Sequence, residues 1–60
     1  MNAPTPTEVK NARLDANLTQ TEAAALVYVQ MRHWRNYEKG GTAMPRGLWE
    51  LFCIKTRGGI

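Results

Sequence analysis

The segment from Leu18 to Gly40 constrains the fold of this 60-residue chain more than any other stretch. Its first residues, Thr19-Gln20-Thr21-Glu22, allow the Thr19 hydroxyl to accept from the Glu22 amide while the Glu22 carboxylate accepts from the Thr19 amide. This reciprocal pattern is a capping box, so it predicts a helix that begins at Gln20. Three alanines at positions 23 to 25 favour that helix and let another helix approach closely. We expect the helix to end near Val27.

A second helix is predicted to begin at Gln30, only a few residues after the first one ends. Trp34 and Tyr37 are three residues apart, so they lie on one side of this helix and we expect them to face inward. The opposite side carries amides, guanidinium groups and an imidazole, which match base edges and phosphates in a major groove. Gly40 and Gly41 then end the helix, because glycine adopts the left-handed conformation that a helix exit needs.

Two further helices are expected on either side of this pair. Thr5-Pro6-Thr7-Glu8 repeats the capping box and has proline at the first helical position, where its missing amide costs nothing. This pattern predicts a helix from about Pro6 to Ala16, with Asn17 as a left-handed exit. A last helix is predicted from about Pro45 to Lys55, where the apolar arc is too wide for a fully solvated surface helix.

The apolar residues of the last helix are expected to serve two purposes. A 60-residue chain buries too little surface to be more than marginally stable alone, which favours dimerisation. Met44 is open to two interpretations, as a plug for the core or as part of a dimer contact, and so is Phe52. The expected core residues are Leu14, Leu26, Trp34, Leu48, Leu51 and Phe52. The expected dimer contacts are Met44, Trp49, Phe52 and Cys53.

Two short helices joined by a three- to four-residue turn, the second polar and basic on its outer face, are typical of a helix-turn-helix. The run L-T-Q-x-E-A-A-x-L-V from Leu18, the apolar Val29, Trp34 at a buried aliphatic position, and Tyr37-Glu38-x-Gly40 resemble the lambda-repressor/Cro (Xre-like) DNA-binding family. The resemblance covers roughly residues 5 to 55. It implies a compact, all-α, four-helix domain there. Outside it, we expect a disordered N-terminus at residues 1 to 4 and a flexible tail at residues 56 to 60.

Tyr28 departs from the family pattern, which commonly has glycine at this position of the turn. A left-handed tyrosine would be strained. Either the turn is built differently in this chain, or Tyr28 adopts a tolerable variant and uses its ring against a neighbouring helix.

The residue types and the resemblance together give candidate DNA contacts. Arginine forks onto guanine, and asparagine or glutamine onto adenine. The candidate base contacts are Gln30, Met31, Arg32, His33 and Asn36. The candidate phosphate contacts are Thr19, Gln20, Arg35, Lys39 and Arg46. The role of Gln20 is implied by the resemblance, since the matching glutamine of the family commonly contacts the DNA backbone. For each residue the alternative is a solvated polar side chain that contributes only solubility.

The charge of the chain is unevenly distributed. Residues 1 to 31 have two basic and three acidic residues, a net charge of −1, whereas residues 32 to 60 have six basic and two acidic residues, a net charge of +4. A positive field from the second predicted helix onward is what a polyanionic partner requires. The chain has no long uncharged apolar run and no segment that resembles a secretory signal. We therefore expect a soluble protein of the bacterial cytoplasm, associated with the nucleoid when bound to DNA.

No metal, cofactor or catalytic site is expected. One cysteine, Cys53, and one histidine, His33, provide neither an internal disulfide nor a zinc site from a single chain. His33 has no serine, cysteine or carboxylate placed with it in a recognisable triad. Glu22 is explained by a helix cap and Glu38 by an ion pair within the motif. We expect neither an enzyme nor a small-molecule ligand.

These observations favour a sequence-specific regulator that binds double-stranded DNA as a homodimer on an inverted repeat. One short helix reads only a few base pairs, and two copies related by a dyad double the contacts. A protein this small resembles phage or mobile-element autorepressors, and its closing run from Gly47 to Phe52 resembles regulators found beside anti-CRISPR genes. The alternative is an antitoxin or inhibitor that uses the apolar part of the last helix, with Met44, Trp49 and Cys53, to bind a partner protein.

Overall fold

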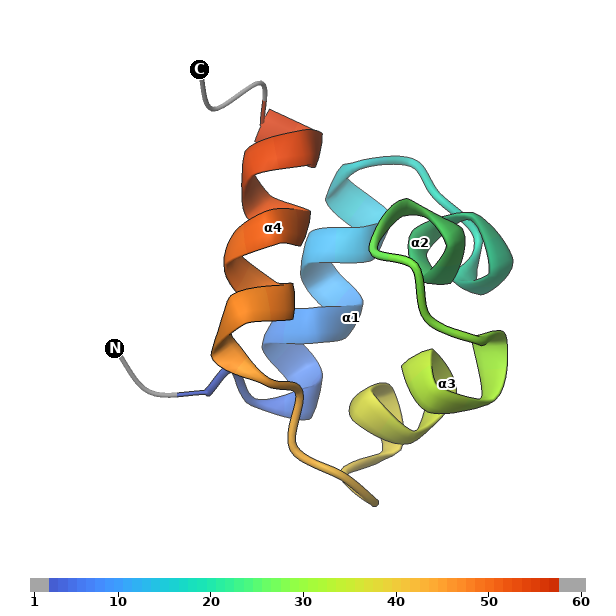
Figure 1. Cartoon of the computed structure of the whole chain (residues 1–60), viewed down its shortest axis with the longest axis vertical. Helices are drawn as coiled ribbons and strands as arrows, with labels where there is room; N and C mark the ends of the chain where they lie inside the picture. Colours follow the sequence, from blue (N-terminus) through green and yellow to red (C-terminus); the bar gives the residue numbers. More distant parts are fainter. Residues whose placement is uncertain (1–2, 58–60) are drawn as a thin grey trace.

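The computed structural model of the chain describes residues 3 to 57, which form four α-helices and, in that range, no strand (Figure 1). The helices are α1 (Pro6–Asp15), α2 (Gln20–Leu26), α3 (Met31–Lys39) and α4 (Arg46–Arg57). The predicted all-α, four-helix fold is confirmed, and each helix lies where the sequence placed it to within two residues.

The two ends of the described chain differ from the prediction. Pro4 is buried, so the expectation of disorder is wrong for that residue. Thr56 and Arg57 belong to the last turn of α4, where the Thr56 hydroxyl donates to the carbonyl of Phe52 at 2.8 Å. The expected tail is therefore helical up to Arg57. The remaining residues of those two expectations, 1 and 2 and 58 to 60, lie outside the described residues.

Both predicted capping boxes are present. The Thr5 hydroxyl accepts from the amide of Glu8 at 3.1 Å, and the Glu8 carboxylate accepts from the amide of Thr5 at 2.8 Å. The second box repeats this arrangement between Thr19 and Glu22, at 3.1 and 2.9 Å. Each cap stabilises its helix by about 1 kcal/mol, and for a helix of only seven residues such as α2 that contribution is substantial.

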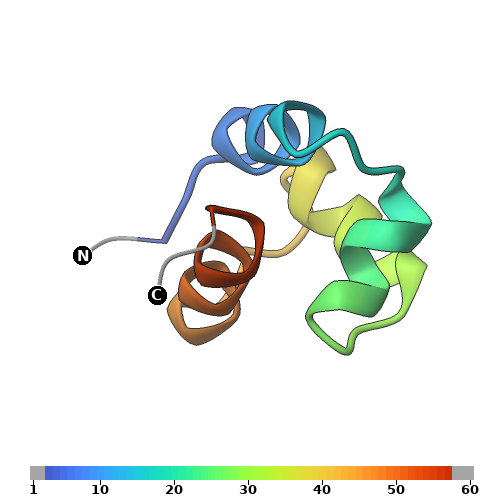
Figure 2. The same cartoon turned by 90° about the horizontal axis from the view of Figure 1, so that it is seen from above.

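The helices pack with α2 and α3 together on one side of α1 and α4 (Figure 2). Trp34 of α3 lies at the centre and is fully buried; its ring centroid is 4.9 Å from that of Phe52 in α4 and 6.3 Å from that of Tyr37. The core therefore joins the two halves of the molecule through α3. The buried hydrophobic residues are Val9, Ala23, Ala24, Val27, Trp34, Tyr37, Met44 and Phe52.

Three packing expectations are corrected by this core. Met44 and Phe52 are 1% and 0% exposed, so neither is available for a dimer contact. The loop between α3 and α4 turns Met44 back into the core, and Phe52 packs against Trp34. Leu14 is 52% exposed and is not a core residue. Val9, Ala12 and Arg13 lie on the inner side of α1, because residues three and four positions apart share a helix face. Leu14 is the next residue after Arg13 and does not lie on that face.

Candidate nucleic-acid interface

Four polar residues form the outward face of α3, opposite its buried side. Arg32, Arg35, Asn36 and Lys39 have the spacing i, i+3, i+4, i+7, which places them along one side of a helix. All four are exposed, and together they line one shallow hollow. We call these four residues the α3 crest. Three cations and one amide on a rigid support can bind an anionic partner and donate or accept hydrogen bonds.

The opposite side of α3 is held by a buried carboxylate, Glu38. It accepts hydrogen bonds from Arg13 Nε at 2.6 Å and Nη2 at 3.2 Å, from Gln20 Nε2 at 3.2 Å and from Trp34 Nε1 at 2.5 Å. The donors come from α1, α2 and α3, so one side chain links three helices. Arg13 also donates to the carbonyl of Leu18 at 3.0 Å, which fixes the loop between α1 and α2. The ion pair predicted for Glu38 is present, but its partner, Arg13, belongs to α1 and lies outside the Leu18–Gly40 segment.

The environment of Glu38 keeps this carboxyl ionised. Burial alone raises its pKa, because the charged form loses hydration. Hydrogen bonds from Arg13, Trp34 and Gln20, together with the positive charge of Arg13, act in the opposite direction, and the net result is a pKa below the ordinary value for glutamate. At neutral pH α3 is therefore attached to α1 and α2 by a charged, fully bonded group.

Two of the predicted phosphate contacts have structural roles in the protein itself. Gln20 is half-buried, and its amide nitrogen is directed to Glu38 rather than outward. The Thr19 hydroxyl caps α2 by accepting from Glu22. The capping box predicted the role of Thr19. The contact between Gln20 and Glu38 was not predicted by the family resemblance. The other three predicted phosphate contacts, Arg35, Lys39 and Arg46, are exposed at the surface.

The five predicted base contacts are divided among different parts of the α3 surface. Arg32 and Asn36 belong to the α3 crest. Met31 lies on the flank toward α2, where the Thr21 hydroxyl approaches its sulfur at 3.1 Å. His33 is exposed on the opposite flank, because successive residues are about 100° apart around a helix. Gln30 is the exposed residue just before the helix and makes no side-chain cap.

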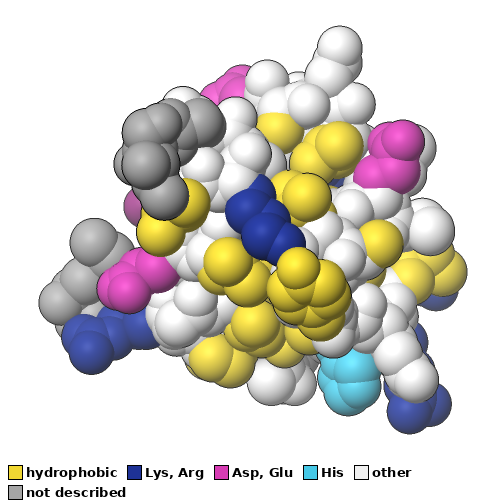
Figure 3. Space-filling view, turned by 45° about the horizontal axis from the view of Figure 1, so that its top comes forward, with side chains coloured by type: hydrophobic (Ala, Val, Ile, Leu, Met, Phe, Trp, Pro, Cys, Tyr) yellow, Lys and Arg dark blue, Asp and Glu magenta, His cyan; other side chains and the backbone are white. Residues whose placement is uncertain are grey.

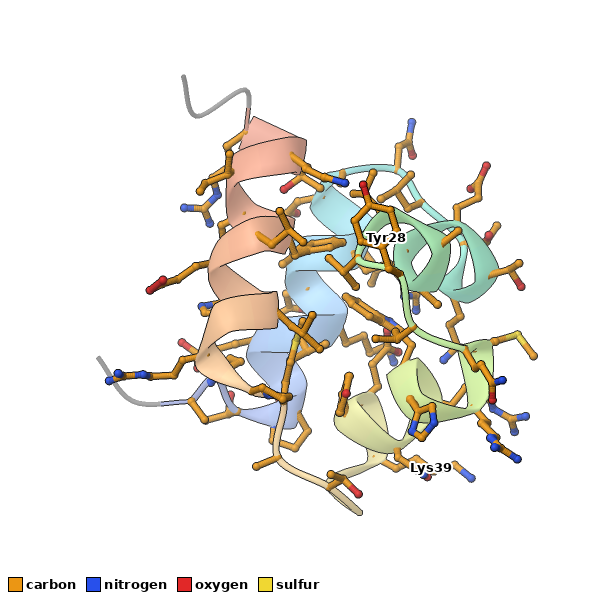
Figure 4. All side chains as sticks on the ribbon, in the orientation of Figure 1. Tyr28 and Lys39 are labelled. Carbon is orange, nitrogen blue, oxygen red and sulfur yellow. The ribbon has the colours of Figure 1, made fainter. Side chains whose placement is uncertain are left out.

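The turn between α2 and α3 contains a left-handed tyrosine. Tyr28 has φ 63°, and the residue is 79% exposed. The Tyr28 side chain is labelled in Figure 4. Lys55 of α4 lies over its ring, with the ammonium nitrogen 4.1 Å from the ring centroid and 2.8 Å from the phenol oxygen. The same ammonium donates to the carbonyl of Leu26 at 2.9 Å. The ring is thus used against a neighbouring helix, which was one of the two alternatives for this turn.

Lys55 also affects the ionisation of Tyr28. Its hydrogen bond to the phenol oxygen, followed by its positive charge, lowers the pKa of Tyr28. The expected ring contact named no partner, and Lys55 could not be predicted as that partner because it is 27 positions from Tyr28. The contact ties α4 to the end of α2 at the point where the chain turns into α3.

No group of three or more histidine, cysteine, aspartate or glutamate side chains is placed to hold a metal ion within residues 3 to 57. None of the helices in that range has the length and apolar character needed to cross a membrane. No protein-family model matches the chain, and no curated protein is significantly similar to it.

Proposed function

We propose that this protein is a sequence-specific regulator that binds double-stranded DNA through the outward face of α3. The observation that carries the proposal is the division of α3 into two sides. Trp34 and Tyr37 are buried and Glu38 is bonded to three helices, while the α3 crest is exposed. A helix held so firmly on one side can present its other side to a major groove, which is wide enough to admit an α-helix.

The residues of the α3 crest divide into two roles in this proposal. Arg32 and Asn36 are about one turn apart on the crest, where they reach base edges; arginine prefers guanine and asparagine prefers adenine. A good bidentate pair gives about 1–3 kcal/mol of discrimination against a wrong base. Arg35 and Lys39, on the same crest, neutralise phosphates on the groove walls. Met31 and His33 are on the flanks and contact only the edges of the site.

We further propose that the protein binds an inverted repeat as a homodimer and represses the promoter that contains it. The nine residues of α3 span about 13 Å, enough for only a few base pairs. Two copies with their reading helices about one duplex turn apart double that sequence information. A bound dimer in a promoter would exclude RNA polymerase. A phage or mobile-element operon in the bacterial cytoplasm, including an anti-CRISPR operon, is the setting that suits a regulator of this size.

The test is a fluorescence-anisotropy titration with a duplex from the upstream region of the gene. Arg32→Ala and Asn36→Ala should each weaken specific binding by about 5- to 150-fold, as loss of one bidentate pair implies. Lys10→Ala, a charge-matched control on the exposed side of α1, should bind as the parent does. Affinity should fall steeply between 50 and 200 mM salt. If the folded α3 variants bind as tightly as the parent, or salt has no effect, DNA binding through α3 is wrong.

A second candidate function is a protein-interaction module of the antitoxin or inhibitor type. It is favoured by the hollow along α4 that Trp49, Cys53 and Ile54 line, since Ile54 is 46% exposed. This function predicts that Ile54→Ser abolishes binding to the partner protein, while Arg32→Ala has no effect on that binding. The DNA-binding proposal predicts that Arg32→Ala is the more damaging change.

A further inference from the structure

Met31 is an exposed apolar residue at the edge of the polar surface of α3. It is the first residue of the helix and is 42% exposed. Arg35 of the α3 crest is four positions further on, so the two side chains are neighbours on the helix surface. Exposed apolar side chains are also found elsewhere on the molecule, and Figure 3 shows several of them gathered on one face. Exposure alone therefore does not distinguish Met31, whereas its place beside the crest and its bond to α2 do.

The side chain of Met31 is held from the neighbouring helix. The Thr21 hydroxyl of α2 donates a hydrogen bond to the Met31 sulfur at 3.1 Å. Methionine is unbranched and flexible, so an unrestrained methionine loses much conformational freedom when a partner covers it. The bond from Thr21 restricts that freedom before any partner binds. An apolar side chain is thus presented at a defined place beside the α3 crest.

The bond between Thr21 and Met31 is not needed to join α2 to α3. The two helices are already joined by the hydrogen bond from Gln20 to Glu38 and by the buried core to which both contribute. A thioether sulfur is only a weak hydrogen-bond acceptor, so the bond from Thr21 adds little to the stability of the fold. Its main consequence is the position of the Met31 side chain.

The chemistry of Met31 matches one group in the major groove of DNA. The features that distinguish the base pairs there are hydrogen-bond donors, hydrogen-bond acceptors and the C5-methyl group of thymine, which is apolar. Methionine has no hydrogen-bond donor, and the Met31 sulfur already accepts from Thr21. We propose that Met31, positioned by Thr21, contacts the C5-methyl group of a thymine at the edge of each half-site. This inference rests on the proposed function, since it requires α3 to lie in the major groove.

This contact gives the protein a preference for thymine over cytosine at one position of each half-site. Cytosine has a hydrogen atom at C5 and offers no methyl group to bury. Burial of one methyl-sized apolar group strengthens binding by about 4-fold. A dimer on an inverted repeat makes the contact twice, which gives about 15-fold in total. The specificity of the α3 crest for guanine and adenine is thus extended by an apolar contact at its edge.

The first test compares two forms of one duplex from the upstream region of the gene. One form has thymine, and the other has deoxyuridine in place of every thymine, which removes the methyl groups and keeps every base pair. In fluorescence anisotropy the parent should bind the deoxyuridine form about 4-fold more weakly as a monomer and about 15-fold more weakly as a dimer. Met31→Ala should lose this difference. Leu14→Ala, at an exposed apolar position of α1, is the matched control and should keep it.

The second test examines Thr21 as a positioning residue. Thr21→Val removes the hydroxyl and keeps the shape of the side chain, so Met31 is released and part of the difference between the two duplexes should be lost. Thr21→Ser keeps the hydroxyl and should behave as the parent does. Both variants should melt close to the parent in circular dichroism, because the bond is not needed for the fold. A Thr21→Val chain that binds both duplexes more weakly by the same factor would assign the hydroxyl to a DNA phosphate and overturn the positioning role.

The outcomes distinguish this inference from the proposed function. A parent chain that binds both duplexes equally tightly reads no methyl group, which overturns the inference and leaves the roles of Arg32 and Asn36 intact. A difference of the same size in the parent and in Met31→Ala also overturns it, because the methyl groups then act through another residue or through the shape of the duplex. A parent chain that binds neither duplex refutes the proposed function and the inference together. A difference that disappears with the Met31 side chain supports both.

Discussion

Replacing Glu38 by glutamine should remove most of the stability of this protein. The carboxylate side chain is 7% exposed, its partner Arg13 is 12% exposed, and the two make an ion pair of 2.6 Å. Glutamine has nearly the same shape, but it places an N–H₂ group among four N–H donors and leaves Arg13 without a counter-charge. Removing one member of a buried pair typically costs 3–5 kcal/mol, and we expect about 3 kcal/mol because Arg13 keeps some contact with water.

That loss is large for this chain. Domains of fewer than about 70 residues rarely have more than about 3–5 kcal/mol of stability from their core. Glu38→Gln should therefore lower the urea midpoint to near zero in a circular dichroism titration at pH 7. Asp15→Asn, which removes an exposed carboxylate from α1, is the control and should change the free energy of unfolding by less than about 0.5 kcal/mol.

A double-mutant cycle separates the ion pair from simple loss of packing. Arg13→Met with Glu38→Gln removes both charges, so it should be less destabilising than the sum of the two single changes by about 1–3 kcal/mol. The reasoning is refuted if Glu38→Gln unfolds at the same urea concentration as the parent, or if the two single effects simply add. Either result would mean that the buried carboxylate does not hold α3.

Three further predictions follow from the same contacts. Because the pKa of Glu38 is lowered in the folded state, its contribution is complete above the ordinary glutamate pKa and is lost as the pH falls through the lowered value. The difference in urea midpoint between the parent and Glu38→Gln should thus be constant near neutrality and shrink below about pH 4; a difference unchanged down to pH 2 would contradict this. At the turn, Tyr28→Gly relieves the left-handed backbone while Tyr28→Ala does not, and both lose the contact with Lys55. The glycine variant should melt at the higher temperature, and the reverse order would show that the backbone is unstrained. Thr19→Ala should cost about 1 kcal/mol in chemical denaturation through loss of the α2 cap, whereas Thr7→Ala, at a helical position that caps nothing, should cost less; equal effects would count against the cap.

The sequence predicted those parts of the fold that depend on neighbouring residues. The capping boxes at Thr5 and Thr19 and the exits at Asn17 and Gly40 involve groups within three or four positions, so the pattern specifies both the residues and the bonds. The inward side of α3 was predicted for the same reason, because the spacing of Trp34 and Tyr37 fixes it.

Contacts between distant segments were harder to predict. An ion pair was expected for Glu38, but its convergence with Arg13 and Gln20 depends on how α1 and α2 are placed around α3. Met44 and Phe52 were each consistent with a core or a partner contact, since periodicity shows which side of a helix is apolar and not what covers it. The structure decides both in favour of the core.

The candidate nucleic-acid interface was also predicted only in part. The exposed polar side of α3 was predicted as one set of five residues, yet helical geometry separates that set into a crest and two flanks. Arg35 and Lys39, expected only at the phosphates, lie on the crest beside Arg32 and Asn36. The spacing i, i+3, i+4, i+7 places these four residues on one side of the helix.

α4 is joined to the rest of the domain on two of its sides. Phe52 on its inner side packs against Trp34, and Lys55 on its flank bonds to the end of α2 and to Tyr28. A strained tyrosine in the turn is then explained by the contact it provides to α4, which glycine at that position would not make.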